Sequence, residues 1–254
     1  PASTFMSSIT PYNLIINHSS ANVRYTGSSS TTMTIANDLT ITAGIFDPDD
    51  GDENLTVTGD VSVTGTLGAS NVTSAMSFGS LTIESGGTYI ATSGTTTLTG
   101  KNGSNYMLQN SGTFTHNKGT VRFEADTSSG TWYATSASSV EANSIKFYNL
   151  ETVRTGSAGS YRFFVGGNSF YLVVLNNLTI GVNTSIYSSN GTSILRHYGQ
   201  FFNIEGSAGF DNVTDVQCGL ITIGSAGVLE FDSGDQAISC TGIRNLRGSA
   251  GIQA

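Results

Sequence analysis

The chain has 254 residues, and nearly half of them are Ser, Thr, Gly or Asn (35, 34, 31 and 20 residues). Charged residues make up only 11%, where an ordinary globular domain has about 25%. A hydrophobic content of 37% suffices for a core, which argues against a disordered chain. Too few helix-forming residues are present for a helical bundle, and Gly lacks the collagen spacing. The composition therefore predicts an all-β protein rich in turns and β-branched residues.

The charge balance excludes two classes of partner. The net charge is −8, and the three lysines, Lys101, Lys118 and Lys146, are far apart in the sequence. Binding to nucleic acid phosphates needs clustered Lys and Arg, so we expect no nucleic-acid partner. No stretch approaches the ~20 apolar residues that cross a bilayer, so we expect no membrane span.

Short stretches of alternating apolar and polar residues recur along the chain, often directly after an Asn or Asp. Their leading apolar residues are at positions 14, 39, 55, 81, 150, 178, 204, 221 and 246. A period of two predicts β-strands, for example at 38–41, 80–83 and 177–180. No amphipathic helical pattern accompanies them, and the intervening loops are too short for crossover helices.

A second motif follows several of these stretches. Gly-Ser-Ala-Gly occurs at 156–159, 206–209, 224–227 and 248–251, and each complete copy precedes another apolar stretch. Gly allows the positive φ of a sharp bend, and Ser and Ala are small enough to follow it. The motif therefore predicts a tight turn between two strands.

Two all-β architectures fit this pattern, and repetition favours one of them. A parallel β-solenoid stacks equivalent residues of successive coils about 4.8 Å apart, which suits ladders of Asn, Thr and Ser. We predict a single solenoid domain of about ten coils over residues 1–254. The sequence leaves open whether this domain is excised from a longer chain. The alternative is an antiparallel β-sandwich or barrel.

Three runs carry a resemblance to known proteins: residues 81–90, 146–150 and 175–180, with their Asn-Leu-Thr-Ile and Gly-rich turns. They resemble the repeats of right-handed parallel β-helix proteins found in phage tail fibres, tailspikes and other virion appendages, and in bacterial surface adhesins. The likeness covers residues 12–252. It implies a scaffold fold and carries no catalytic motif.

One acidic cluster is a weak calcium candidate. Its carboxylates are Asp47, Asp49, Asp50, Asp52 and Glu53. Clustered oxygen ligands suit calcium, but the spacing does not follow the EF-hand pattern. The alternative is a solvated loop that keeps the molecule soluble.

The two cysteines are 22 residues apart, close to the length of one coil. Cys218 and Cys240 would then lie on neighbouring coils, either bridged by a disulfide or stacked as buried thiols. Two cysteines without a neighbouring His are a poor metal site, so no metal and no cofactor are expected.

Aromatic residues are concentrated between Ile145 and Phe202. The tyrosines of this region are Tyr148, Tyr161, Tyr171, Tyr187 and Tyr198. Aromatic rings with polar edges suit a face that binds a glycan or a protein partner. The alternative is that these rings only stack within and around the coils.

Catalytic patterns are weak. The carboxylate pairs Asp211 with Asp215 and Glu230 with Asp232 could act as in a carbohydrate-cleaving tailspike. We favour solvated faces for both pairs and expect no enzyme activity. No nucleophile elbow, zinc-protease motif or phosphate-binding loop is present.

The sequence predicts a structural or adhesive protein at a virion surface or outside the cell. The first hypothesis is a tail fibre, a tailspike stem or a capsid decoration protein. A bacterial cell-surface or biofilm adhesin is the second, and a carbohydrate-cleaving tailspike is the third. No capping segment is evident at either end of the repeats. Open solenoid ends pair readily, so we expect other protein subunits as partners, in a homo-oligomer such as a trimer or by end-to-end stacking.

Overall fold

The chain is a parallel β-solenoid, and the residues that the structure describes form essentially no helix. The structure is a computed structural model that describes residues 3–6, 9–26, 31–48, 53–68, 72–125, 133–135, 143–155, 161–165, 171–182, 184–187, 193–209, 213–230, 237–246 and 252–253. Every strand register described in these ranges is parallel, for example between Thr56 and Ser77 and between Thr179 and Asn203. The predicted solenoid is confirmed over the antiparallel sandwich or barrel. No helix in the described ranges is long and apolar enough to span a membrane.

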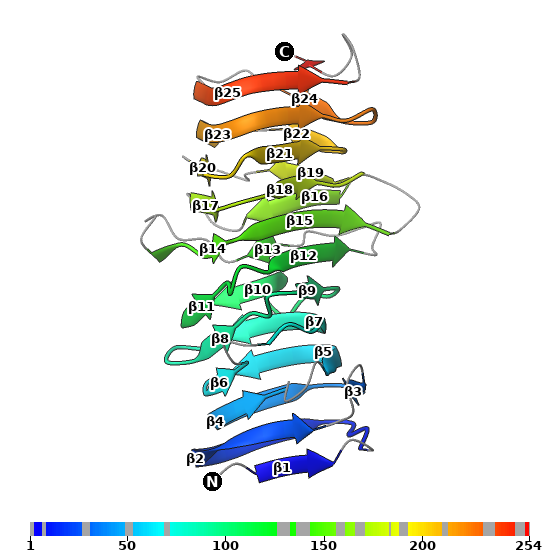
Figure 1. The fold of residues 1–254 in the computed structure, drawn as a ribbon, viewed down its shortest axis with the longest axis vertical. Helices are drawn as coiled ribbons and strands as arrows, with labels where there is room; N and C mark the ends of the chain where they lie inside the picture. The colour runs from blue at the N-terminus through cyan, green and yellow to red at the C-terminus, as the bar shows by residue number, and fades with distance from the viewer. Residues whose placement is uncertain are drawn as a thin grey trace. The chain divides into compact units, whose positions relative to one another are not determined.

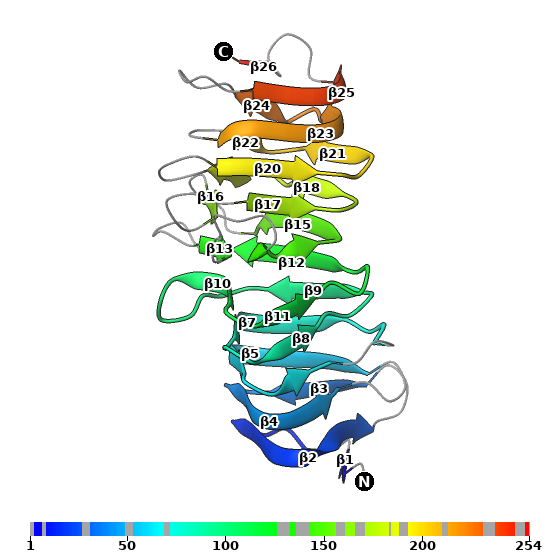
Figure 2. The same cartoon turned by 90° about the vertical axis from the view of Figure 1, so that its left-hand side faces the viewer.

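The chain divides into two compact units, residues 1–121 and 122–254. Within each unit, Figures 1 and 2 show the strands stacked as successive rungs. The strands of the first unit are β1 (Ser3–Met6), β2 (Leu14–Thr26), β3 (Thr32–Ile35), β4 (Leu39–Asp47), β5 (Asn54–Val63), β6 (Thr66–Leu67), β7 (Met76–Ile83), β8 (Thr88–Ile90), β9 (Thr95–Leu98), β10 (Tyr106–Asn110) and β11 (Thr113–Thr115), and β12 (Thr120–Ala125) crosses the boundary. Those of the second unit are β13 (Tyr133–Thr135), β14 (Lys146–Phe147), β15 (Asn149–Arg154), β16 (Tyr161–Val165), β17 (Tyr171–Val174), β18 (Leu178–Ile180), β19 (Thr184–Tyr187), β20 (Ser193–His197), β21 (Phe201–Ile204), β22 (Ser207–Gly209), β23 (Val213–Ile223), β24 (Val228–Glu230), β25 (Ala237–Asn245) and β26 (Ile252–Gln253). The predicted single domain stays a prediction.

Several long strands of the first unit bend and so contribute to two faces of the coil. The first half of β5 pairs with β3, and its second half pairs with β4. Gly59 stands at that bend, where an added Cβ would lie 2.9 Å from the backbone oxygen of Asn37. At Gly79, in β7, a Cβ would lie 2.5 Å from the oxygen of Gly59. Coils at this spacing leave no room for a side chain at the corner, so the repeated Gly there is a packing requirement.

The interior of each unit is a set of apolar columns that run from coil to coil. Alternate residues of each strand point inward, as in β5, where Leu55, Val57, Val61 and Val63 are all buried. One column of the first unit holds Leu14, Leu39, Val61, Leu81 and Leu108 in register. The matching column of the second unit holds Leu150, Leu178, Phe202, Ile221 and Ile243. Burial of these columns is the main source of stability.

The copies of the sequence repeat are not one per coil. Leu55 is not in register with Leu39, because Val61 takes that place and Leu55 lies on the neighbouring face of the coil. The solenoid has about 7 turns, fewer than the ten coils predicted. A long strand such as β5 bends at a corner of the coil. The sequence pattern does not show that the segments before and after this bend belong to the same coil.

The Gly-Ser-Ala-Gly motifs differ from one another in structure. Residues 224–227 form the predicted tight turn between β23 and β24, closed by a hydrogen bond from the Gly227 N–H to the Gly224 carbonyl. In the copy at 206–209, only Gly206 is at the bend, and Ser207–Gly209 form β22. The turn prediction is wrong for this copy, because its last three residues pair with β24 in the next coil. The copies at 156–159 and 248–251 lie outside the described residues.

Candidate functional site

A side-chain clamp joins successive coils at the residue before the leading apolar residue of a strand. Asn13 Oδ1 accepts hydrogen bonds from the Asp38 N–H at 3.1 Å and from Asn37 Nδ2 at 2.9 Å. In the second unit, Asn149 Oδ1 accepts from the Asn177 N–H at 3.2 Å and from Asn176 Nδ2 at 2.8 Å. Each unit thus builds the same clamp around an Asn acceptor. This contact explains why Asn precedes the leading apolar residues.

The clamp extends into a ladder in the first unit. Asp38 Oδ1 accepts from the Asp60 N–H at 2.9 Å, and Asp60 Oδ1 accepts from the Ser80 hydroxyl at 2.7 Å. On another face, Asn54 Oδ1 accepts from the Ala75 N–H at 2.9 Å. Each bond satisfies a backbone or hydroxyl donor of the next coil, and so each one fixes the stacking register.

Hydroxyl side chains form outward columns on the same strands, half-buried except at the exposed Thr113. One column consists of Thr34, Thr56, Ser77 and Thr97, and another of Thr66, Thr88 and Thr113. Small β-branched side chains tolerate stacking at the strand spacing without charge repulsion. Equivalent side chains of successive coils therefore stack on the outer face of these strands, as the apolar side chains do in the interior.

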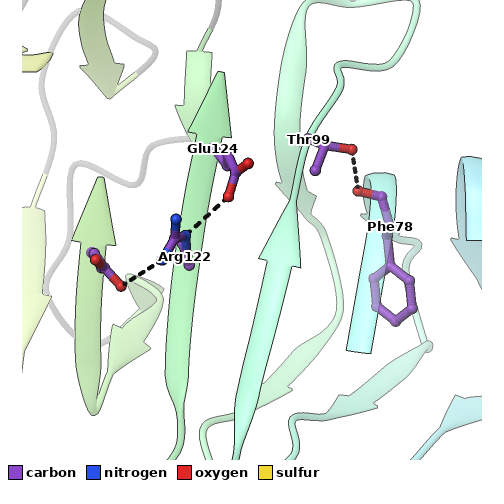
Figure 3. A network of polar contacts seen from close by, with 5 residues as sticks. Phe78, Thr99, Arg122 and Glu124 are labelled. Atoms are coloured by element: carbon purple, nitrogen blue, oxygen red, sulfur yellow. Dashed lines mark hydrogen bonds and ion pairs between the residues drawn. The ribbon is translucent and has the colours of Figure 1, made fainter. Parts of the chain in front are cut away.

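Figure 3 shows polar contacts of both units from close by. In the first unit, the Thr99 hydroxyl donates to the Phe78 carbonyl at 3.2 Å. This bond joins the residue after β9 to β7 of the preceding coil. In the second unit, Arg122 Nε lies 3.0 Å from Glu124 Oε2 on the same strand, and Arg122 also contacts Glu151 at 3.7 Å. These ion pairs are about one-third exposed, so solvent weakens them.

The acidic cluster is only partly described, because Asp49, Asp50 and Asp52 lie outside the described residues. The described members are not solvated: Asp47 is 2% exposed and Glu53 is 1% exposed. Asp47 Oδ2 is ion-paired with Arg24 Nε at 3.2 Å. In the described ranges, no three His, Cys, Asp or Glu side chains are grouped to hold a metal ion. The calcium site stays a prediction.

The aromatic region separates into buried and exposed rings. Phe147 and Phe202 are fully buried, whereas Phe201 is 49% exposed and Tyr198 is 59% exposed. Tyr148 and Tyr171 are half-buried, and the side chains of Tyr161 and Tyr187 lie outside what the structure describes. The five tyrosines therefore do not all form one described face.

A partly exposed corner is nevertheless present in the second unit. Phe147, Val174 and His197 are in register, so the residues that follow them, Tyr148, Leu175 and Tyr198, stack as the next column. Phe201 pairs with Leu220 a few residues further on. We call Tyr148, Leu175, Tyr198, Phe201 and Leu220 the aromatic corner. Phe201 was not among the predicted residues, because nothing in Phe201-Phe202 distinguishes the exposed ring from the buried one.

The cysteines lie where the repeat length predicts. Cys218 of β23 and Cys240 of β25 are direct partners on neighbouring coils. Cys218 is buried, Cys240 is half-buried, and both are free thiols in this structure. Burial raises the pKa of Cys218 to about 12, and the neighbouring Cys240 adds to the shift. The choice between bridge and stacked thiols stays open at this point.

His197 is the buried histidine of this region. It is 3% exposed, its Nε2 lies 2.6 Å from the Asn176 carbonyl, and its ring is 5.9 Å from that of Phe202. Burial lowers the pKa of His197, and backbone groups of Asn176 and Phe201 oppose part of that shift. A neutral ring that donates from Nε2 to the carbonyl fits this setting, so His197 is a packed interior residue.

The predicted carboxylate pairs find no described catalytic geometry. Asp215 is ion-paired with Arg196 at 2.7 Å, and its suggested partner Asp211 lies outside the described residues. Asp232 and the side chain of Glu230 also lie outside them. The one described member is thus engaged with a cation, which leaves the tailspike-like hydrolysis hypothesis without a described pair.

Comparisons with known proteins returned no family model, no curated protein and no solved structure that matches this chain.

Proposed function

We propose that this chain is a non-enzymatic structural and adhesive module of an extended surface appendage. The observation that carries the proposal is the parallel stacking of the described strands, with apolar columns and side-chain clamps that run from coil to coil. Side chains that could do chemistry are instead engaged in that stacking, such as His197 with the Asn176 carbonyl and Asp215 with Arg196. A solenoid built in this way supplies length and rigidity.

We favour a virion component, namely a tail fibre, a tailspike stem or a capsid decoration protein. The resemblance of the Asn-Leu-Thr-Ile repeats to those of virion appendages supports this choice. A bacterial surface adhesin is the alternative. Both place the chain at a virion surface or outside the cell, with other protein subunits as partners. Ile243 supports such a partner: it occupies the inward column of β25 and is 43% exposed, whereas Ile221 below it is fully buried.

The aromatic corner is the proposed adhesive surface. Its rings provide flat apolar area with polar edges, which suits a surface glycan or an apolar patch of a protein. The matched variants are Tyr198→Ser with Phe201→Ser at the corner, and Thr56→Ser with Thr97→Ser on a hydroxyl column. We expect only the corner variant to lose binding to host cells or glycans. Equal binding by both variants would remove the corner from the proposal.

Labelling with gold-conjugated antibodies tests the location. Label on the tails or shells of virus particles is the expected result, and label on bacterial envelopes in place of particles would select the adhesin. Incubation with host polysaccharides tests the absence of chemistry. We expect no new reducing ends, and released oligosaccharides would overturn the non-enzymatic assignment.

A further inference from the structure

Two thiols face each other across the last pair of long strands in the second unit. Cys218 and Cys240 are direct partners, and the register is held on both sides by Val216 with Ile238 and by Ile221 with Ile243. Parallel strands lie about 4.8 Å apart, which falls inside the Cα separation of about 4.4–6.8 Å found across disulfides. The register therefore places the two cysteines at a backbone separation that a disulfide can span.

The side chains leave the sheet on the same side. Cys218 is buried next to the exposed Gln217, and Cys240 is half-buried between the exposed Ser239 and Thr241. Residues that are partners in parallel strands point to the same face, so both sulfurs are on the inner side of the coil. The difference in exposure makes Cys240 the thiol that a dissolved oxidant reaches first.

We propose that Cys218 and Cys240 form a disulfide between neighbouring coils, which staples β25 onto β23. The oxidant is a small-molecule disulfide such as oxidised glutathione. The Cys240 sulfur attacks this disulfide and releases one thiol, and the Cys218 sulfur then attacks the mixed disulfide and releases the second. The two cysteines lose two electrons and two protons, and the oxidant gains them as two thiols.

The staple acts on a coil whose inward apolar column is partly exposed. Ile243 of β25 is 43% exposed, although its column partners Phe202 and Ile221 are fully buried. Fewer apolar contacts favour local opening of β25. A disulfide closing a loop of this length restricts the opened chain, so we expect oxidation to reduce the open fraction of β25 by on the order of a hundredfold. This inference does not depend on the proposed function.

The test is to incubate the folded full chain with oxidised glutathione, quench it, unfold it, and alkylate the remaining thiols before intact-mass analysis. We expect loss of two hydrogens, no alkylated cysteine, and return of both thiols after reduction. Hydrogen exchange of the oxidised protein should show slower exchange in residues 237–245 and unchanged exchange in the first unit.

The matched control is the double variant Ser239→Cys with Cys240→Ser. It moves the thiol by one residue to an exposed, outward position in register with Gln217. We expect this variant to stop at a mixed disulfide with glutathione. Two free thiols in the oxidised wild type, a bridge between chains, or equally fast bridging in the control would overturn the proposal.

Discussion

The two units use the same clamp but continue it differently. In the first unit, the position before each residue of the apolar column remains polar through four coils, in the order Asn13, Asp38, Asp60 and Ser80. In the second unit it begins as Asn149 and Asn177 and then changes to Phe201 and Leu220. The first unit therefore uses this position to hold the register, whereas the second presents apolar surface there.

The interiors differ in a related way. The first unit contains an aromatic series in which the buried Tyr89 lies between Phe78 and the half-buried Phe114, and the Tyr89 hydroxyl is 2.7 Å from the Thr96 hydroxyl. The second unit places His197 and Cys218 at neighbouring inward positions. A histidine and a thiol are thus buried in the second unit, which should respond to acid through His197 and to thiol oxidants through its cysteine pair.

The largest expected effect comes from deleting a buried ring in either unit. Phe78→Ala and Phe202→Ala should each lower the free energy of unfolding by about 3–5 kcal/mol, because each leaves a cavity in the buried interior. Phe201→Ala is the matched control and should cost less than about 1.5 kcal/mol, since its ring is half-exposed. Chemical denaturation measures all three. Equal losses at Phe201 and Phe202 would contradict the assigned register.

Removing a clamp acceptor should have the next largest effect. Asp38→Ala leaves the Asp60 N–H without its partner and should cost about 1–2 kcal/mol in the first unit. Asn149→Ala is the equivalent change in the second unit and should cost a similar amount. Asp38→Asn keeps an oxygen at the same place and should retain most of the stability. An Asn variant as unstable as the Ala variant would show that charge, rather than the bond to the next coil, matters at this position.

Acid should destabilise the second unit through His197. Because its pKa is lower in the folded protein than the ordinary value of 6.5, the unfolded chain binds the proton more readily. Stability is therefore full above pH 6.5 and falls as the pH drops below it, by at most about 1.4 kcal/mol per pH unit. His197→Gln should remove this dependence, as followed by thermal unfolding between neutral and mildly acidic pH. His116→Gln in the first unit, where partial burial also lowers the pKa, should change it less.

The smallest expected effect is at the exposed ion pairs of the second unit. Glu124→Gln removes one carboxylate from Arg122 and should change stability by about 0.2–1 kcal/mol. The difference between wild type and variant should shrink at high salt, because salt screens exposed charges. A loss that persists at high salt would mean that this pair contributes through packing.

Much of the fold could be predicted from alternation, turn residues and the repeat, including the parallel stacking of Cys218 with Cys240. The function of Asn13 and Asn149 could not be predicted, because their bonds go to residues of another coil and depend on the register. The placement of Leu39 and Leu55 on different faces also escaped prediction, since the bend lies inside a continuous strand pattern. For the candidate site, Phe201 and Phe202 show the limit most clearly: adjacent identical residues differ only through which side of β21 faces the interior.

The central claim is that successive coils stack in the stated register, and a pair of engineered thiols tests it most directly. In a Cys218→Ser, Cys240→Ser background, Thr40→Cys with Ser62→Cys places two outward thiols on partner positions. The off-register control is Thr40→Cys with Thr64→Cys, on the same side of the chain. We predict that a thiol cross-linker spanning about 5 Å joins the first pair much faster than the second. Faster cross-linking of the control pair, with equal labelling of all thiols by a monofunctional reagent, would contradict the register.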